Sequence, residues 1–597
     1  MNASWLIQLV QTPVVVYAVV LTIAWTLIQL ASKIGRRETK VRVNEKLVLA
    51  ALWIYMVLAL AAIVIDVKIF PFLHSAMFAL TLCAALCASP KRSAPLLTVT
   101  LIVALMPVMV MVSTKHPLPL GDDARFIGFA AIIKSDGRWI PFKYPENPYY
   151  QPFHLIPAIE YVLASITGVG IKSLEGIMAC YLTLKLALYL AYFILLFLFV
   201  RRLVNSAASP LVAVLLLSIT PPLAFPQVVH QNYAIVLSLA TLLIMSRTRE
   251  ISSGADSIAE HFLWISGIIA HATYTIIVSA FALPIIFMCR QERQKIVKAT
   301  GILFMISLTY WIFTYVIDVI MRPSINAFDR LMDLITGRTS LFYRASRPWY
   351  GPEQREFFIA WALVPSIIAS YVLLLALAAP LKTILYTLSA KRKSLKNFLC
   401  EKHGINAFFE HYIIALSFLG LGGTIINFIL RALPTFGGRY FYWLYLLMLP
   451  SSVILLTKTT RKILGSILSI ILISVTAFYG VQDPTIVADT YGNYIGWADR
   501  GSWYISYAIS TFLTPSLFAR VDARLAAPLA AIRPFGFNSA GFNIKPVLLL
   551  IGADRVGLFQ IFSEPNVFQL SNINYSSIIL EFYIYNGFVD EASSFIP

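Results

Sequence analysis

Long apolar runs separated by short polar stretches dominate the first 480 residues of the chain. A helix needs about 20 apolar residues to cross the ~30 Å hydrocarbon layer of a bilayer, and runs of this size recur as far as Gly480. They begin near Thr12, Leu47, Ile69, Ala94, Ser173, Pro210, Gln227, Ala299, Phe357, His411, Tyr440 and Ile463. The pattern predicts an α-helical polytopic protein that crosses a membrane many times.

Basic residues between these runs indicate the orientation. Lys and Arg are enriched in cytoplasmic loops, so a cluster of them identifies the inner side. Six such residues separate the first two runs, and two more follow the third, namely Lys33, Arg36, Arg37, Lys40, Arg42, Lys46, Lys91 and Arg92. These connections are predicted to be cytoplasmic, which places the segment that follows Lys115 outside.

The apolar region from His261 to Cys289 has an ambiguous length. As one helix it would cover about 43 Å, which is too long for one crossing and short for two. Two short crossings that meet near His271 put most of the later basic residues inside, whereas one crossing puts them outside. We therefore predict two, which gives about 14 spans in a membrane domain of residues 1–480, with outer loops 115–172 and 319–356. Both termini then lie outside the cell membrane.

The character of the sequence changes after Gly480. An Ala-rich segment from Leu513 to Ala531 is typical of a helix, whereas Val547–Ile551 and Ile578–Tyr585 are rich in β-forming residues. The remaining stretch has a plausible length for a small domain. Residues 481–597 are predicted to form a small mixed α/β extracytoplasmic domain.

Composition supports the membrane interpretation. The chain is 59% hydrophobic and only 13% charged, with a mean hydropathy of +0.77, which is more apolar surface than one soluble core can hide. The net charge of +18 is explained by basic cytoplasmic loops, so no nucleic-acid partner is predicted. The five cysteines lack metal-ligand spacing, and neither disulfides nor a cysteine metal site are expected.

Two adjacent acids, Asp122 and Asp123, precede a helical pattern in the first large outer loop, and Gly137 closes it. One interpretation is structural, with one Asp as the N-cap and Gly137 as the residue just after the C-terminus. One cap needs only one acid, however. In the functional interpretation, the second carboxylate is a general base toward an acceptor hydroxyl on the outer face. The residues alone leave both open.

The same loop resembles the first outer loop of archaeal membrane glycosyltransferases of the GT-C superfamily. The resemblance rests on the acid pair, the helix ending in Asp136–Pro141, the run Pro152-Phe153-His154 and a helix closed by Ile166-Thr167-Gly168. Ala270-His271-Ala272-Thr273 and Gly438-Arg439-Tyr440-Phe441 are similar to other elements of these proteins.

The resemblance implies a GT-C-like fold and an inverting glycosyltransferase. The donor would be a sugar on a polyprenyl (dolichyl-type) phosphate, and the acceptor a glycan, lipid or protein at the outer membrane surface. Asp122 and Asp123 match the catalytic acids of the loop. Whether a divalent metal takes part is left open. The chain departs from the family in three extra helices before this loop. It also has Trp497-Ala498-Asp499 near the place of the Trp-Trp-Asp signature of the oligosaccharyltransferase branch.

The departing polyprenyl phosphate is anionic, and preorganised arginines are suited to bind it. The outer loop from Met321 to Glu356 holds six arginines, and two more flank a short outer loop. Interfacial snorkelling or a solvated loop explains them as well. The candidate substrate-binding residues are Arg125, His154, His271, Arg338, Arg344, Arg431 and Arg439. His271 can equally satisfy the freed backbone of a broken helix.

Two other classes of protein remain open from the sequence. Broken helices and polar residues inside the membrane also build transporters. A non-catalytic membrane scaffold fits the same composition. Against a transporter, the chain shows no repeated half, and its polar residues gather in the outer segments instead of at mid-membrane.

Overall fold

The structure of the chain is a computed structural model. The described residues are 45–65, 69–88, 93–114, 153–167, 174–204, 207–218, 230–247, 254–288 and 290–314, single positions within 126–137, 316–336 and 416–477, and the strand segments 519–521, 548–553, 567–575 and 578–585.

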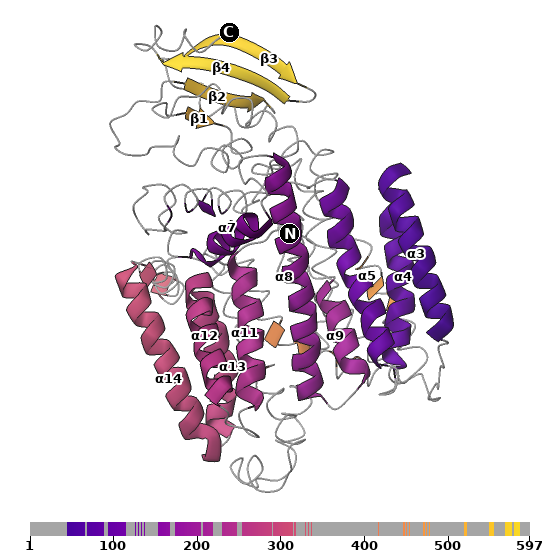
Figure 1. The fold of residues 1–597 in the computed structure, drawn as a ribbon, viewed down its shortest axis with the longest axis vertical. Helices are drawn as coiled ribbons and strands as arrows, with labels where there is room; N and C mark the ends of the chain where they lie inside the picture. The colour runs from indigo at the N-terminus through magenta and orange to yellow at the C-terminus, as the bar shows by residue number, and fades with distance from the viewer. Residues whose placement is uncertain are drawn as a thin grey trace, which may run out of the picture.

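The helical part of the chain forms a bundle (Figure 1). Its helices are α3 (Glu45–Ile65), α4 (Phe70–Leu86), α5 (Ser93–Thr114), α7 (Leu155–Thr167), α8 (Leu174–Leu203), α9 (Ala208–Ser218), α11 (His230–Arg247), α12 (Gly254–Ala270), α13 (Thr273–Met288) and α14 (Arg290–Phe313). Five of them, α3, α4, α5, α8 and α9, begin within two residues of a predicted apolar run. The prediction of a helical fold is confirmed for this part of the chain.

The break near His271 is also confirmed. Helix α12 ends at Ala270 and α13 begins at Thr273. Whether α12 and α13 each cross a membrane stays a prediction. In the described segments, one helical stretch, Leu182–Leu203 within α8, is both long and apolar enough for a crossing. The other apolar helical stretches there have 10–17 residues. The total of 14 spans stays a prediction too.

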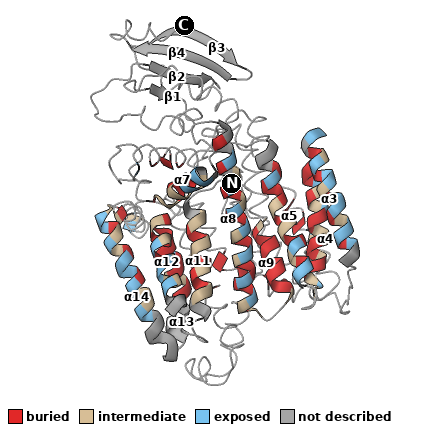
Figure 2. Ribbon diagram, viewed as in Figure 1, coloured by how far each residue is buried: buried red, intermediate tan, exposed pale blue. Residues whose placement is uncertain are grey.

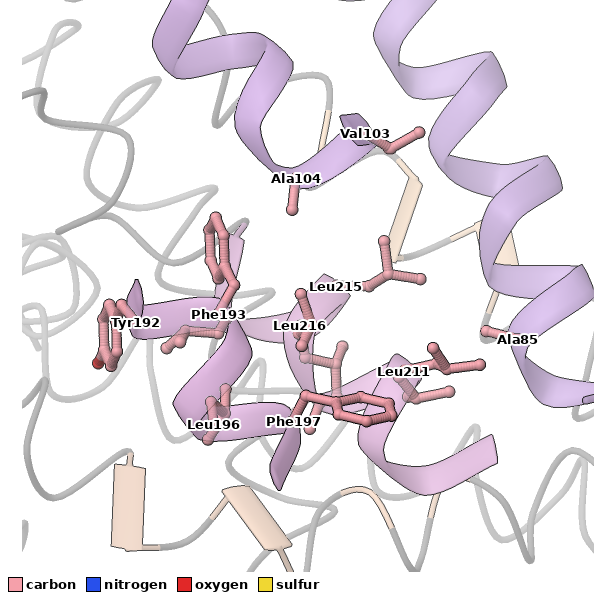
Figure 3. Close-up of a cluster of buried hydrophobic side chains, with 14 of the residues drawn as sticks. Ala85, Val103, Ala104, Tyr192, Phe193, Leu196, Phe197, Leu211, Leu215 and Leu216 are labelled. Atoms are coloured by element: carbon pink, nitrogen blue, oxygen red, sulfur yellow. The ribbon is translucent and has the colours of Figure 1, made fainter. Parts of the chain in front are cut away.

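Helix α9 lies at the centre of one half of the bundle. It is apolar on every side, and all its residues from Ala208 to Leu217 are buried, as expected for a helix with no polar face. It contacts α4, α5 and α8. In Figure 3, Leu211, Leu215 and Leu216 of α9 gather with Phe193 and Phe197 of α8 in one apolar cluster.

Helices α11, α13 and α14 are joined by hydrogen bonds between side-chain hydroxyl groups. The Thr241 hydroxyl in α11 and the Tyr274 hydroxyl in α13 are 2.6 Å apart, and the hydroxyls of Thr275 in α13 and Ser307 in α14 are also 2.6 Å apart. All four groups are buried. Such bonds hold helices together where burial of apolar surface gives little preference for one neighbour over another.

The outward surfaces of several helices are apolar. On α3, Trp53 is 68% exposed and Val64 is 85% exposed, and on α14 Phe313 is 78% exposed. Figure 2 shows the exposed stripe along α3 and α14, on the sides turned away from the rest of the bundle. These helices therefore carry apolar residues on both their buried and their exposed faces.

Four strands are described in the C-terminal part, namely β1 (Ala519–Val521), β2 (Leu548–Ala553), β3 (Val567–Tyr575) and β4 (Ile578–Tyr585). They form one sheet in the order β1-β2-β4-β3, in which β1 pairs parallel with β2 and the other pairs are antiparallel. Strands β2 and β4 lie on the two β-rich runs found in the sequence. The outer location of this segment stays a prediction.

The prediction of a helix over Leu513–Ala531 is wrong at its centre, because Ala519–Val521 form strand β1. Alanine favours helices only weakly as a prior, and tertiary pairing overrides it. Here the backbone of Arg520 is in register with Leu549 of β2, a partner far along the chain that local composition does not reveal.

Candidate functional site

The segment predicted to be the first outer loop contains the predicted helix. Phe126, Phe129, Ala130 and Ile133 are helical. Gly137 has a φ of +69°, and its backbone N–H donates to the carbonyl of Ile133 at 2.9 Å. This left-handed residue with a hydrogen bond back by four positions is a common helix C-terminus that glycine forms without strain. The predicted role of Gly137 as the capping glycine is confirmed.

This loop helix packs against α7. The side chains of Phe126, Phe129 and Ile156 form a buried cluster, and Tyr233 of α11 is packed against it. The rings of Phe126 and Phe129 meet edge to face with centroids 6.3 Å apart, an arrangement that aromatic pairs prefer. Helix α7 lies beside α8 and contacts α11 and α12, so it connects the loop helix to the bundle (Figure 1).

His271 organises the break between α12 and α13. Its backbone N–H donates to the carbonyl of Gly267 at 3.1 Å, which ends α12, and its carbonyl accepts from the N–H of Tyr274 at 3.0 Å. The ring nitrogen Nδ1 accepts the backbone N–H of Thr273 at 3.2 Å and lies 2.7 Å from the Thr273 hydroxyl. His271 therefore caps the first turn of α13 in the way that Ser or Asp does elsewhere.

The same contacts define the tautomer of His271. A backbone N–H only donates, so Nδ1 must be the accepting nitrogen of the ring. A neutral imidazole with an accepting Nδ1 carries its hydrogen on Nε2. Of the two roles left open for His271, the structure bears out the one in which it satisfies freed backbone groups at a broken helix, and its role in substrate binding stays a prediction. Its Nε2 is a hydrogen-bond donor.

The start of α7 and the helix break are in direct contact. The rings of Phe153 and His271 have centroids 4.8 Å apart with an interplanar angle of 40°. Phe153 also belongs to a buried cluster with Ala272, Trp311 and Val316. His154, the neighbour of Phe153, is half-buried, as is His271. The structure thus brings Phe153 of the Pro-Phe-His run together with the broken helix.

The remaining candidates lie outside the described residues. These are Asp122, Asp123, Arg125, Arg338, Arg344, Arg431 and Arg439. Their roles stay predictions. Among the segments that are described, no group of three or more His, Cys, Asp or Glu side chains is placed to share a metal ion, and Cys83, Cys87 and Cys180 are free thiols.

Two buried charged residues were not identified as candidates from the sequence. Lys185 in α8 is completely buried, and Glu160 in α7 is 3% exposed. Glu160 lies inside α7. The signal for Lys185 was a lone cation within a long apolar run, and such a residue is a functional candidate in a membrane protein.

No family model and no curated protein matches the chain. The case for its function therefore rests on its own residues and their arrangement.

Proposed function

We propose that the chain is an integral membrane glycosyltransferase that transfers a sugar from a polyprenyl-phosphate donor to an acceptor at the outer face. The observation that supports this best is the meeting of three segments. The first-loop helix packs on α7 through Phe126 and Ile156, and the ring of Phe153 contacts that of His271 at the helix break. These are the segments that resemble a GT-C enzyme, and a transfer site requires them to be close together.

The acid pair is connected to this contact region by a short stretch of chain. Asp123 precedes the anchored Phe126 by three residues, and three residues span at most about 11 Å even when fully extended. We propose that the substrate binds beside the loop helix, within reach of a carboxylate on this tether. This supports Asp122 or Asp123 as the general base.

The distribution of polar and apolar residues supports a bilayer as the surroundings. Large apolar side chains such as Trp53 and Val64 face outward, whereas Thr81, Ser238 and Ser307 are fully buried and hydrogen-bond to carbonyls of their own helices. In water an outward apolar stripe of this extent is a binding or aggregation surface. In lipid it is the expected surface, and we propose about 14 crossings with both termini outside.

In the proposed reaction, the hydroxyl oxygen of the acceptor attacks the anomeric carbon of the sugar. The bond between that carbon and the phosphate oxygen breaks, and the electron pair leaves with the polyprenyl phosphate. One acid of the pair takes the hydroxyl proton. Arginines of the loop 319–356, with Arg431 and Arg439, would stabilise the negative charge on the leaving phosphate.

The proposed topology predicts the reactivity of two engineered cysteines. Position 394 lies in a basic, cytoplasmic connection and position 502 in the outer segment. In sealed cells, a membrane-impermeant thiol reagent should label Ser502→Cys and leave Ser394→Cys unlabelled until the cells are permeabilised. Labelling of position 394 in sealed cells would overturn the assignment.

The arginine-rich loop gives a second prediction. Replacing Arg338, Arg344 and Arg347 together by Gln should raise the donor concentration needed for half-maximal transfer at least tenfold, because charge-assisted contacts to the donor phosphate are lost. The thermal midpoint should not change. Replacing the three basic residues Lys391, Arg392 and Lys393 by Gln is the matched control, since we place them inside. An unchanged donor requirement would make the loop a solvated connector.

A transporter is the second candidate, because the break between α12 and α13 is of the kind that builds substrate sites in transporters. The two functions differ in their product. A transferase splits the donor and releases polyprenyl phosphate, whereas a transporter moves an intact substrate across the bilayer. Measuring both in the same liposomes separates them.

A further inference from the structure

Trp311 has a buried hydrogen-bond donor without an acceptor. It lies near the end of α14 and is 6% exposed, and its indole Nε1 has no hydrogen-bond partner among the residues that the structure describes. An indole N–H can only donate, and a buried donor that finds no acceptor is costly. A bound ligand that supplies an acceptor oxygen would remove this cost.

The surroundings of Trp311 are aromatic and close to the helix break. Trp311 packs in one cluster with Phe153 and Ala272, and Tyr310 is packed against the same cluster. Ala272 belongs to the break itself, and the ring of Phe153 contacts that of His271, whose Nε2 carries a hydrogen. The groups gathered here are thus flat apolar rings and uncharged N–H donors.

A second buried tryptophan, Trp264, allows the surroundings of Trp311 to be compared with those of a similar side chain. Trp264 in α12 is 3% exposed, and its Nε1 also lacks a partner within the described part of the chain. It packs in a different cluster, with Ile268, Tyr274 and Leu303 inside the bundle. Trp264 therefore has the same unpaired donor without the contact to Phe153 and Ala272, and it provides a matched control.

We propose that the aromatic cluster at the break, made of Phe153, Ala272, Trp311 and Val316, is a subsite for a neutral glycosyl unit. The indole N–H of Trp311 donates to a hydroxyl oxygen of the sugar, and an aromatic ring covers an apolar face of the sugar ring. A phosphate is a poorer occupant, because the described members of this cluster carry no charge. The proposal rests on the proposed function and adds which part of the substrate binds here.

The test measures binding and needs no catalysis. Full-length protein in lipid nanodiscs is mixed with the methyl glycosides of glucose, galactose, mannose and N-acetylglucosamine, and saturation transfer to each sugar is recorded by NMR. At least one glycoside should bind to the wild-type protein. Trp311→Phe keeps a ring but removes the N–H, and it should weaken that binding about tenfold, whereas Trp264→Phe should not change it.

Both Trp variants should retain the wild-type thermal midpoint or exceed it, since each removes an unpaired buried donor. Phe153→Leu, which removes a ring from the same cluster, gives an independent loss of binding if Trp311→Phe fails to fold. The proposal is overturned if no glycoside binds, if Trp311→Phe and Trp264→Phe bind equally, or if inorganic phosphate displaces the sugar. Sugar binding that depends on Trp311 without any sugar transfer would refute the proposed function and leave the subsite standing.

Discussion

One of the two substitutions Asp122→Asn and Asp123→Asn is expected to lower the turnover of sugar transfer about 10²-fold or more, while the protein stays folded. Asn caps a helix about as well as Asp, so the cap's stabilisation of about 1 kcal/mol should be kept in both variants. Asn cannot take a proton from the acceptor hydroxyl. Donor binding should survive, because the lost interaction belongs mainly to the transition state.

The comparison between the two Asn variants separates capping from catalysis. The Asn variant that lacks the general base should lose turnover, and the other Asn variant should lose less. Turnover is measured with a saturating donor, and the thermal midpoint of each variant is measured in parallel. If both variants keep full activity, the acid pair is structural, and the base must be sought at His154 or at Glu146, another acid of the same predicted loop 115–172.

Gly267→Ala is expected to destabilise the helix break by about 1–3 kcal/mol, the usual cost of overpacking a filled interior. A Cβ at Gly267 would overlap the ring of Tyr274, which is completely buried. Moving that ring would also disturb the bond between the Tyr274 and Thr241 hydroxyls. Because Gly267 also accepts the N–H of His271, sugar transfer should fall together with stability.

Gly301 in α14 provides the control for this prediction. A Cβ at Gly301 meets nothing within 4 Å, so Gly301→Ala should be neutral or stabilising by up to about 1 kcal/mol through helix propensity. Unfolding is followed by tryptophan fluorescence during heating in detergent. Equal thermal midpoints for Gly267→Ala and the wild-type protein would contradict the packing described for the break.

Periodic and length-based features of the fold could be predicted from the sequence. Apolar runs located α3, α4, α5, α8 and α9 because burial or lipid contact requires a run of that length. The region from His261 was too long for one helix, and this located the break. Gly137 was recognisable because glycine is the residue that best adopts a left-handed helix end.

Features that depend on distant contacts could not be predicted. Helix α14 begins at Arg290, nine residues before the predicted apolar run, because charged residues extend a helix without contributing to its hydropathy. The contact between Phe153 and His271 joins segments far apart in the chain. Whether the indole N–H of Trp311 finds an acceptor depends on side chains that are distant in the sequence, and no local sequence pattern predicts this.

The central claim, that the chain is a lipid-linked-sugar transferase, is tested most directly by the fate of the donor. Purified protein in liposomes is supplied with a panel of radiolabelled polyprenyl-phosphate sugars and a membrane extract as the source of acceptors. We predict release of free polyprenyl phosphate and transfer of label from at least one donor, with both lost in the sensitive Asp variant. Every donor remaining intact, or an intact donor moving across the bilayer, would contradict the account.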